Sequence, residues 1–181
     1  MILANFHTHT LYCDGKDTPQ EIVKASISSG LSSVGFSGHA YTPFDSTYCM
    51  SPEDTLKYIA EINSLKEEYS NKIEIYLGTE CDLYSEINKN KYDYIIGSVH
   101  YVKSGENYLP VDDSEESMVS CVENFFNGDY MKYVSSYYES VSKLAGIYPD
   151  IIGHFDLVTK FNQNNKYFDE GSKKYIELAY F

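Results

Sequence analysis

The sequence predicts an α/β fold in which short parallel strands alternate with covering helices. The first observation is a series of short apolar runs, β-branched or aromatic and nearly continuous, as expected of strands buried on both faces. These runs are Ile2–Phe6, Leu31–Phe36, Ile73–Leu77, Tyr92–Ile96 and Asp150–Ile152. The second observation is that helical patterns with clear start signals lie between them. This alternation fits either a doubly wound sheet or a barrel.

The first two helices are marked by capping residues. Thr18-Pro19-Gln20-Glu21 supplies an N-cap Thr, a Pro at the first helical position and a Glu at the third, and Gly30 ends this helix. Ser51-Pro52 repeats the device and opens a helix that runs to about Tyr69. Each of these helices follows an apolar run and precedes another, as a parallel sheet requires.

The second half of the chain carries further helix starts at Ser114 and Asp129, and Gly146 is expected to close the second. The final segment, Asp169–Phe181, reads as a helix that stops while still apolar. About five strands are too few for a closed parallel barrel of about eight. We therefore expect a single domain over residues 1–181 that is truncated at its C-terminal end.

Composition limits the possible partners. The 181 residues suffice for one core, and 43% of them are hydrophobic. Fourteen basic residues against 27 acidic ones give a net charge of −13, and no Lys/Arg run exists, so we expect no nucleic-acid partner. Bound divalent cations would supply local positive charge for an anionic substrate. The oligomeric state stays open.

The four cysteines are far apart and form no Cys-x-x-Cys pair. The N-terminus lacks the basic region and long apolar run of a signal peptide, and no stretch approaches the ~20 apolar residues of a membrane span. We expect a cytoplasmic protein with reduced thiols and no membrane partner.

The histidines provide the strongest functional signal. His7 and His9 form His-Thr-His, and in a strand such residues share a face and can bind one ion. Alone this is a weak signal that two structural histidines would also explain. Asp14 follows in Cys-Asp-Gly, where an Asx turn is the alternative to a metal ligand.

Four further candidates stand at the carboxyl ends of predicted strands, the edge that carries ligands in α/β folds. They are His39, Glu80, His100 and His154, each placed one to three residues after a Gly. Each could be a structural residue on its own, but their common placement predicts one shared metal site. With imidazole and carboxylate ligands, Zn, Mn or Fe is expected rather than Ca or Mg.

Two residues near His154 receive supporting roles. Asp156 could ligate a metal, but orienting His154 is the preferred role. Lys160 could reach a substrate phosphate, although a lone Lys is usually a solvated surface charge. The sequence contains no Gly-x-Ser-x-Gly, Walker loop or Cys-x5-Arg motif, so no side-chain nucleophile is assigned.

Six motifs in order resemble the PHP (polymerase and histidinol phosphatase) superfamily, most closely its bacterial histidinol-phosphate phosphatases. They are His7-Thr8-His9, Cys13-Asp14-Gly15, Ser37-Gly38-His39, Gly78-Thr79-Glu80, Gly97-Ser98-Val99-His100 and Gly153-His154-Phe155-Asp156. The resemblance spans nearly the whole chain. It implies a distorted (β/α)7 barrel with two to three divalent ions (Zn, Mn or Fe) at the carboxyl ends of its strands.

The resemblance also implies how the ligands are shared. His7, His9 and Glu80 would hold one ion, Glu80 would bridge to a second held by His100 and His154, and Asp14 and His39 would hold a third. A later Asp-x-His motif of the family is absent from this sequence.

The implied reaction is hydrolysis of L-histidinol phosphate to L-histidinol and phosphate in histidine biosynthesis, by a metal-activated hydroxide. Two alternatives stay open. One is another PHP phosphoesterase acting on phosphotyrosine or a nucleotide, and the other is a catalytically impaired PHP remnant that serves as a metal-binding or interaction module.

Overall fold

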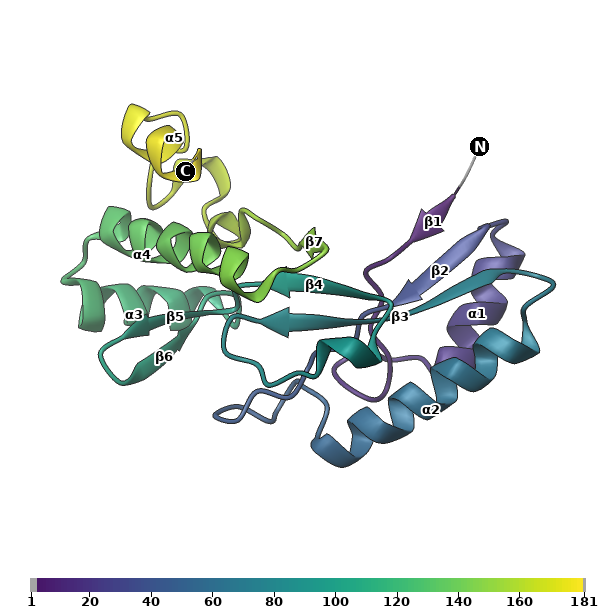
Figure 1. Ribbon diagram of the computed structural model, residues 1–181. Coiled ribbons are helices and arrows are strands. Elements are labelled where there is room, and N and C mark those ends of the chain that lie inside the picture. The colour runs from purple at the N-terminus through teal and green to yellow at the C-terminus, as the bar shows by residue number, and fades with distance from the viewer. Residues whose placement is uncertain (1–2, 181) are drawn as a thin grey trace. The chain divides into compact units, whose positions relative to one another are not determined.

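The computed structural model describes residues 3–180, and its main sheet has five strands in the order β1-β2-β3-β4-β7 (Figure 1). They are β1 (Ala4–Asn5), β2 (Ser33–Phe36), β3 (Glu74–Asp82), β4 (Tyr94–Ser98) and β7 (Ile151–Ile152). The pairs β1–β2, β2–β3 and β4–β7 are parallel. The predicted α/β class and its five strand runs are confirmed, except that Ile2 lies outside the described residues.

The expectation that all strands are buried on both faces was wrong for the two ends of the sheet. Strands β2 and β4 are buried throughout, whereas β1 and β7 are exposed. Ile151 and Ile152 are 40% and 44% exposed, because among residues 3–180 β7 is the last strand of the sheet and pairs on one side, with β4. An apolar run in the sequence does not distinguish an inner strand from an edge strand.

The first four helices begin where the capping residues predicted, whereas the last, expected from Asp169, begins at Lys173 after an N-cap Ser172. The helices are α1 (Pro19–Ser28), α2 (Pro52–Glu68), α3 (Glu115–Phe126), α4 (Tyr130–Lys143) and α5 (Lys173–Ala179). At the start of α1, Thr18 and Glu21 form the full capping box. The expectation that Gly146 closes α4 was wrong, because α4 ends at Lys143 and a 3-10 turn continues over Leu144–Ile147.

The chain divides into two compact units. The first comprises Met1–Gly97 with Pro149–Gly153, and the second comprises Ser98–Tyr148 with His154–Phe181. In the first unit, α1 and α2 pack on β2 and β3 (Figure 1). Their shared core includes Val23, Phe36 and Ile62, each fully buried, and each such side chain stabilises the fold by about 1.5–3 kcal/mol.

The second unit contains α3, α4, α5 and an antiparallel hairpin that the sequence reading missed. The hairpin consists of β5 (Tyr101–Ser104) and β6 (Asn107–Pro110). Its turn contains Gly105 at φ +59°, a left-handed conformation that favours glycine, so Ser-Gly-Glu-Asn was an available turn signal. Short 3-10 helices occur at Lys89–Lys91, Leu157–Thr159 and Gln163–Asn165.

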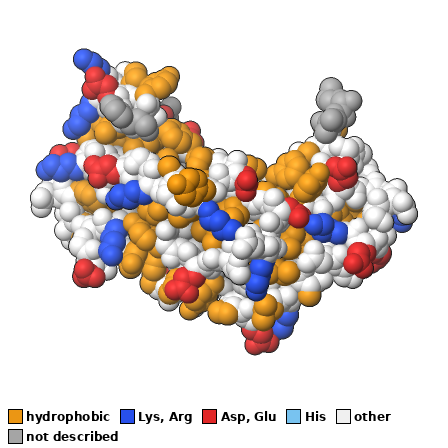
Figure 2. Space-filling model, in the orientation of Figure 1, with side chains coloured by type: hydrophobic (Ala, Val, Ile, Leu, Met, Phe, Trp, Pro, Cys, Tyr) orange, Lys and Arg blue, Asp and Glu red, His pale blue; other side chains and the backbone are white. Residues whose placement is uncertain are grey.

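On the face that Figure 2 shows, basic side chains are scattered among acidic, apolar and uncharged groups and form no continuous basic patch. Across residues 3–180, no helix combines the length and apolar character needed to cross a bilayer.

Candidate metal centre

The loop after β1 places His7 and His9 through a contact with the end of β2. The hydroxyl of Ser37 accepts a hydrogen bond from the backbone N–H of Thr8 at 2.9 Å. In return, the N–H of Ser37 donates to the carbonyl of Thr8, also at 2.9 Å. Because Thr8 lies between the two histidines, both bonds hold the His-Thr-His segment against β2. Sequence reasoning missed Ser37, although it belongs to the motif that precedes His39.

Asp14 reaches the histidines because the loop folds back tightly at Gly15. The N–H groups of Cys13 and Gly15 both donate to the carbonyl of Thr10. A Cβ on Gly15 would lie 2.4 Å from Thr10 N and 2.5 Å from His9 C, so no larger residue fits this turn. His9 Nδ1 and Asp14 Oδ1 are 2.8 Å apart. For Asp14, an Asx turn was the alternative to a role at the metal site. Its contact with His9 explains its position without such a turn.

His39 and Glu80 stand side by side where β2 and β3 end. They form a parallel bridge in which Glu80 N–H donates to Gly38 and Ala40 N–H donates to Glu80. The Thr79 hydroxyl adds a bond of 2.9 Å to the Gly38 carbonyl. The Glu80 side chain is fully buried and that of His39 is 8% exposed. The parallel pairing therefore brings an imidazole and a carboxylate to one edge of the sheet, as the sequence predicted.

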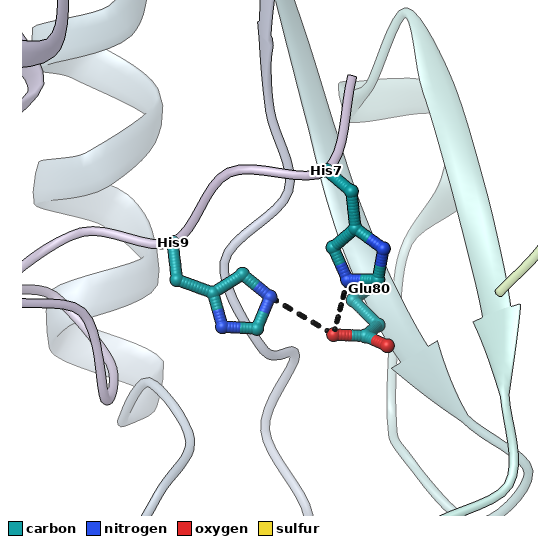
Figure 3. A group of neighbouring side chains, drawn as sticks. All are labelled: His7, His9 and Glu80. Carbon is teal, nitrogen blue, oxygen red and sulfur yellow. Dashed lines mark ion pairs between the residues drawn. The ribbon is translucent and has the colours of Figure 1, made fainter. Parts of the chain in front are cut away.

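Three imidazoles converge on a single oxygen of Glu80. His7 Nε2 lies 3.1 Å and His9 Nε2 3.0 Å from Glu80 Oε2, and Figure 3 shows the two rings pointing at this atom. His39 Nδ1 is 3.3 Å from the same oxygen. On its other side, His39 Nε2 lies 3.7 Å from Asp14 Oδ2.

These separations suit shared coordination. Two donor atoms about 2.1 Å from one ion, at an angle of about 90–110°, lie about 3.0–3.4 Å apart. In the first unit, two groups of side chains each bring their possible ligand atoms within 4.8 Å of one another. One group is His7, His9 and Glu80, and the other is His9, Asp14 and His39. The donor set thus fits one or more divalent ions, with His9 between the two groups.

The charges at the site are already adapted to a cation. Burial is the largest influence on His9 and opposes its protonation, but the carboxylates of Asp14 and Glu80 together outweigh it and raise the pKa of His9 to about 10. The hydrogen bond from His9 holds the pKa of Asp14 at about 2. When Nδ1 of neutral His9 donates to Asp14, its Nε2 carries the lone pair that a metal needs.

His100 and His154 lie in the second unit, where their ring centroids are 5.0 Å apart at an interplanar angle of 62°. His100 is buried and accepts a backbone bond from Val111. His154 has φ +22°, unusual for a residue with a side chain, and its carbonyl accepts from the Tyr137 hydroxyl at 3.2 Å. The structure brings these two histidines together, and their sharing of an ion with Glu80 stays a prediction.

The supporting residues near His154 are exposed. Lys160 Nζ lies 2.7 Å from the carbonyl and 3.3 Å from Oδ2 of Asp112, which follows β6. The carbonyl of Asp156 accepts a bond from Thr159 at the start of a 3-10 turn. The roles predicted for Lys160 and Asp156 therefore stay predictions.

Comparison with known proteins gives a family match to the PHP domain over residues 5–180. A protein of Deinococcus radiodurans named as a candidate histidinol-phosphatase is 31% identical, over 88% of this chain and 62% of its own length. The histidinol-phosphatase of Bacillus subtilis is 28% identical, over 86% of this chain and 66% of its own. The chain thus spans about two thirds or less of the length of these relatives.

Two solved structures share the fold. A candidate histidinol phosphatase of Listeria monocytogenes superposes with a TM-score of 0.80 at 21% identity, over 97% of this chain and 75% of its own. The histidinol phosphate phosphatase of Lactococcus lactis, solved with zinc, L-histidinol and phosphate, superposes with a TM-score of 0.61 at 21% identity. That comparison covers 87% of this chain and 59% of the other. The fold is therefore the PHP type that the motifs predicted.

Proposed function

The chain belongs to the PHP domain family, and from this premise we propose that it is a metal-dependent phosphomonoesterase that hydrolyses L-histidinol phosphate to L-histidinol and phosphate. Its similarity to histidinol-phosphatases of two bacteria supports this substrate. So does the Lactococcus lactis protein of the same fold, which was solved with zinc and both products of that reaction.

One observation carries the proposal: the convergence of His7, His9 and His39 on Oε2 of the buried Glu80. The buried Glu80 and the neighbouring Asp14 favour positive charge at this point, which either a proton on His9 or a bound divalent ion supplies. We propose two to three divalent ions, of Zn, Mn or Fe, as the cations of this site. The proposed ligands are His7, His9, Asp14, His39, Glu80, His100 and His154.

Such ions lower the pKa of a coordinated water and stabilise negative charge on phosphoryl oxygens. The residues of this chain have separate tasks. Glu80 and Asp14 supply the negative charge that holds the cations, and the His9–Asp14 bond orients the imidazole. Lys160 is assigned to binding the substrate phosphate. For this, its ammonium group has to leave Asp112 and bind the phosphate oxygens instead.

The net charge of −13 opposes the approach of a phosphate dianion, so local positive charge at the site is needed to admit it. The proposed partner is accordingly a small phosphorylated metabolite. A reducing, cytoplasmic location is also proposed, and it agrees with four free cysteines.

The test is phosphate release from L-histidinol phosphate with Mn²⁺ or Zn²⁺ added, with phosphotyrosine as a parallel substrate. Glu80→Gln keeps the shape of the side chain and removes its charge, so both metal binding and phosphate release should fall by about 100-fold or more. Glu74→Gln is the matched control, because Glu74 is exposed at the opposite end of the same strand. It should behave like the unmodified chain.

The alternatives give different results. Preference for phosphotyrosine would replace the proposed substrate with another phosphoester. Metal binding that depends on Glu80 without release from either substrate would contradict the proposed activity, and would favour a metal-binding module.

A further inference from the structure

Two buried tyrosines of the first unit reach the backbone beside the candidate ligands. Tyr94 is the first residue of β4 and is 8% exposed, and Tyr58 lies in α2 and is fully buried. Burial raises the pKa of both phenols, so they stay neutral hydrogen-bond donors. Neither side chain belongs to the candidate ligand groups of the first unit, yet their hydroxyls meet three strand ends that carry ligands.

The side chain of Tyr94 crosses two neighbouring strands and reaches the end of β1 at the opposite edge of the sheet. In the sheet order, β3 and β2 lie between its own strand and β1. Its hydroxyl nevertheless lies 2.7 Å from the carbonyl of Phe6 and 3.0 Å from that of Phe36. Phe6 directly precedes His7, and Phe36 lies three residues before His39. Its single hydroxyl proton is shared between these two carbonyls, so the one phenol ties the strand ends that bear these two histidines.

Glycines in the two intervening strands make this passage possible. A Cβ on Gly78 of β3 would lie 2.3 Å from the Tyr94 ring, and a Cβ on Gly35 of β2 would lie 2.5 Å from its hydroxyl. Both distances are far below van der Waals contact. The ring of Tyr94 thus occupies space that side chains at these positions would fill.

Tyr58 joins the neighbouring pair of strand ends from the helix side. Its hydroxyl donates to the carbonyl of Gly78 at 2.9 Å, two residues before Glu80. The N–H of Gly38, directly before His39, points at the same hydroxyl at 3.4 Å. Tyr58 therefore ties the end of β2 to β3, next to the point where Tyr94 ties β1 to β2.

We propose that Tyr58 and Tyr94 are positioning residues that set the spacing of the three strand ends, so that the histidines converge on Glu80 at metal-binding distance. This inference rests on the proposed metal site. Metal–ligand distances in proteins are expected within about 0.2 Å of standard values, and loss of groups that orient ligands weakens metal binding by about 10–100-fold. The two hydroxyls should therefore control metal affinity without touching the metal.

The experiment uses Tyr94→Phe and Tyr58→Phe, which remove the hydroxyl and keep the ring. Affinity for Co²⁺ and Zn²⁺ is measured by competition with a chelator, on protein shown by circular dichroism to be folded. The visible absorption of bound Co²⁺ reports its coordination geometry, which a merely structural role would leave unchanged. We expect each variant to bind about 10–100-fold more weakly, with an altered Co²⁺ spectrum.

Tyr175→Phe is the matched control. It removes another buried phenol, bonded to the Tyr138 hydroxyl at 2.8 Å in the second unit. It should lower stability by a similar amount and leave Co²⁺ affinity within about twofold.

Three results would overturn the inference. Wild-type affinity and spectrum in both tyrosine variants, with binding lost in Glu80→Gln, would refute the positioning role and leave the metal site standing. An equal loss in Tyr175→Phe would show general loosening of the fold. Failure of the unmodified chain to bind Co²⁺ would remove the metal site and the positioning role together.

Discussion

At the scale of single residues, the site depends on glycines as much as on the candidate ligands. Gly15 lets the loop after β1 close so that Asp14 meets His9, and Gly78 lets the ring of Tyr94 pass beneath β3. Neither role needs a special backbone angle. Each follows from the close approach of another group to the position where a Cβ would stand.

Gly78→Ala should test this steric role. The added methyl would meet the Tyr94 ring at 2.3 Å, and overpacking of this kind lowers the free energy of unfolding by about 1–3 kcal/mol. Urea denaturation followed by circular dichroism measures the change. Gly146→Ala is the control, because nothing lies within 4 Å of its Cβ position, and it should be nearly neutral.

Combining Gly78→Ala with a second substitution tests whether the clash with the Tyr94 ring is the cause of the lost stability. In Tyr94→Leu protein the ring is absent, so Gly78→Ala should cost much less than in the unmodified chain. An equal cost in both backgrounds would show that the methyl clashes with something else.

At the scale of elements, two aspartates that directly precede strands each bond to the neighbouring strand of the main sheet. Asp93, before β4, accepts the N–H of Leu77 in β3 at 2.7 Å, and Asp150, before β7, accepts the N–H of Ile95 in β4 at 2.9 Å. Each side chain thereby satisfies a strand N–H where the backbone ladder begins. Asp93 also pairs with Lys66 of α2 at 2.6 Å, which ties that helix to the sheet.

Asp93→Ala should therefore cost about 1–3 kcal/mol in the free energy of unfolding, because it leaves the Leu77 N–H without its acceptor. Lys66→Ala removes only the partly exposed ion pair and should cost less than about 1 kcal/mol. Thermal or urea unfolding of the two variants makes the comparison. Equal losses would assign the effect to the ion pair rather than to the strand.

At the scale of the whole molecule, stability and metal binding are linked. The protein carries a net charge of −13 and also buries the Glu80 side chain completely. Ions that bind the folded chain and not the unfolded one stabilise it, by about 2.7 kcal/mol at a free concentration of 100 times Kd. The same ions would reduce the repulsion between acidic groups around the site.

Removal of metal by a chelator should accordingly lower the melting temperature by about 5–10 °C for a chain of this size. Differential scanning calorimetry with and without added Zn²⁺ measures the shift. Glu80→Gln protein should show little response to either treatment. An unchanged melting temperature in the unmodified chain would contradict strong metal binding by the folded state.

The single-domain organisation over residues 1–181 stays a prediction. The family match runs through both compact units, from residue 5 to residue 180. The five strands and the four helix starts named from the sequence could be read from it because their signals are local. The PHP-type fold was instead implied by the resemblance of six motifs to that family. Caps such as Thr18 and Ser51 act within one turn, and strand patterns within a few residues.

The sequence by itself determined which residue types stand at the strand ends: His7, His9, His39 and Glu80 follow apolar runs, and parallel pairing leaves no other edge for them. Only the tertiary structure decided that His9 lies between Asp14 and Glu80, and that Tyr94 and Tyr58 hold the strands that carry these ligands. The Tyr94 hydroxyl meets a carbonyl 88 positions earlier in the chain. Such a contact leaves no periodic signal in the sequence. Nothing in the sequence distinguishes Tyr94 from the other tyrosines among the nineteen, because its role depends on how β1 to β4 pack together.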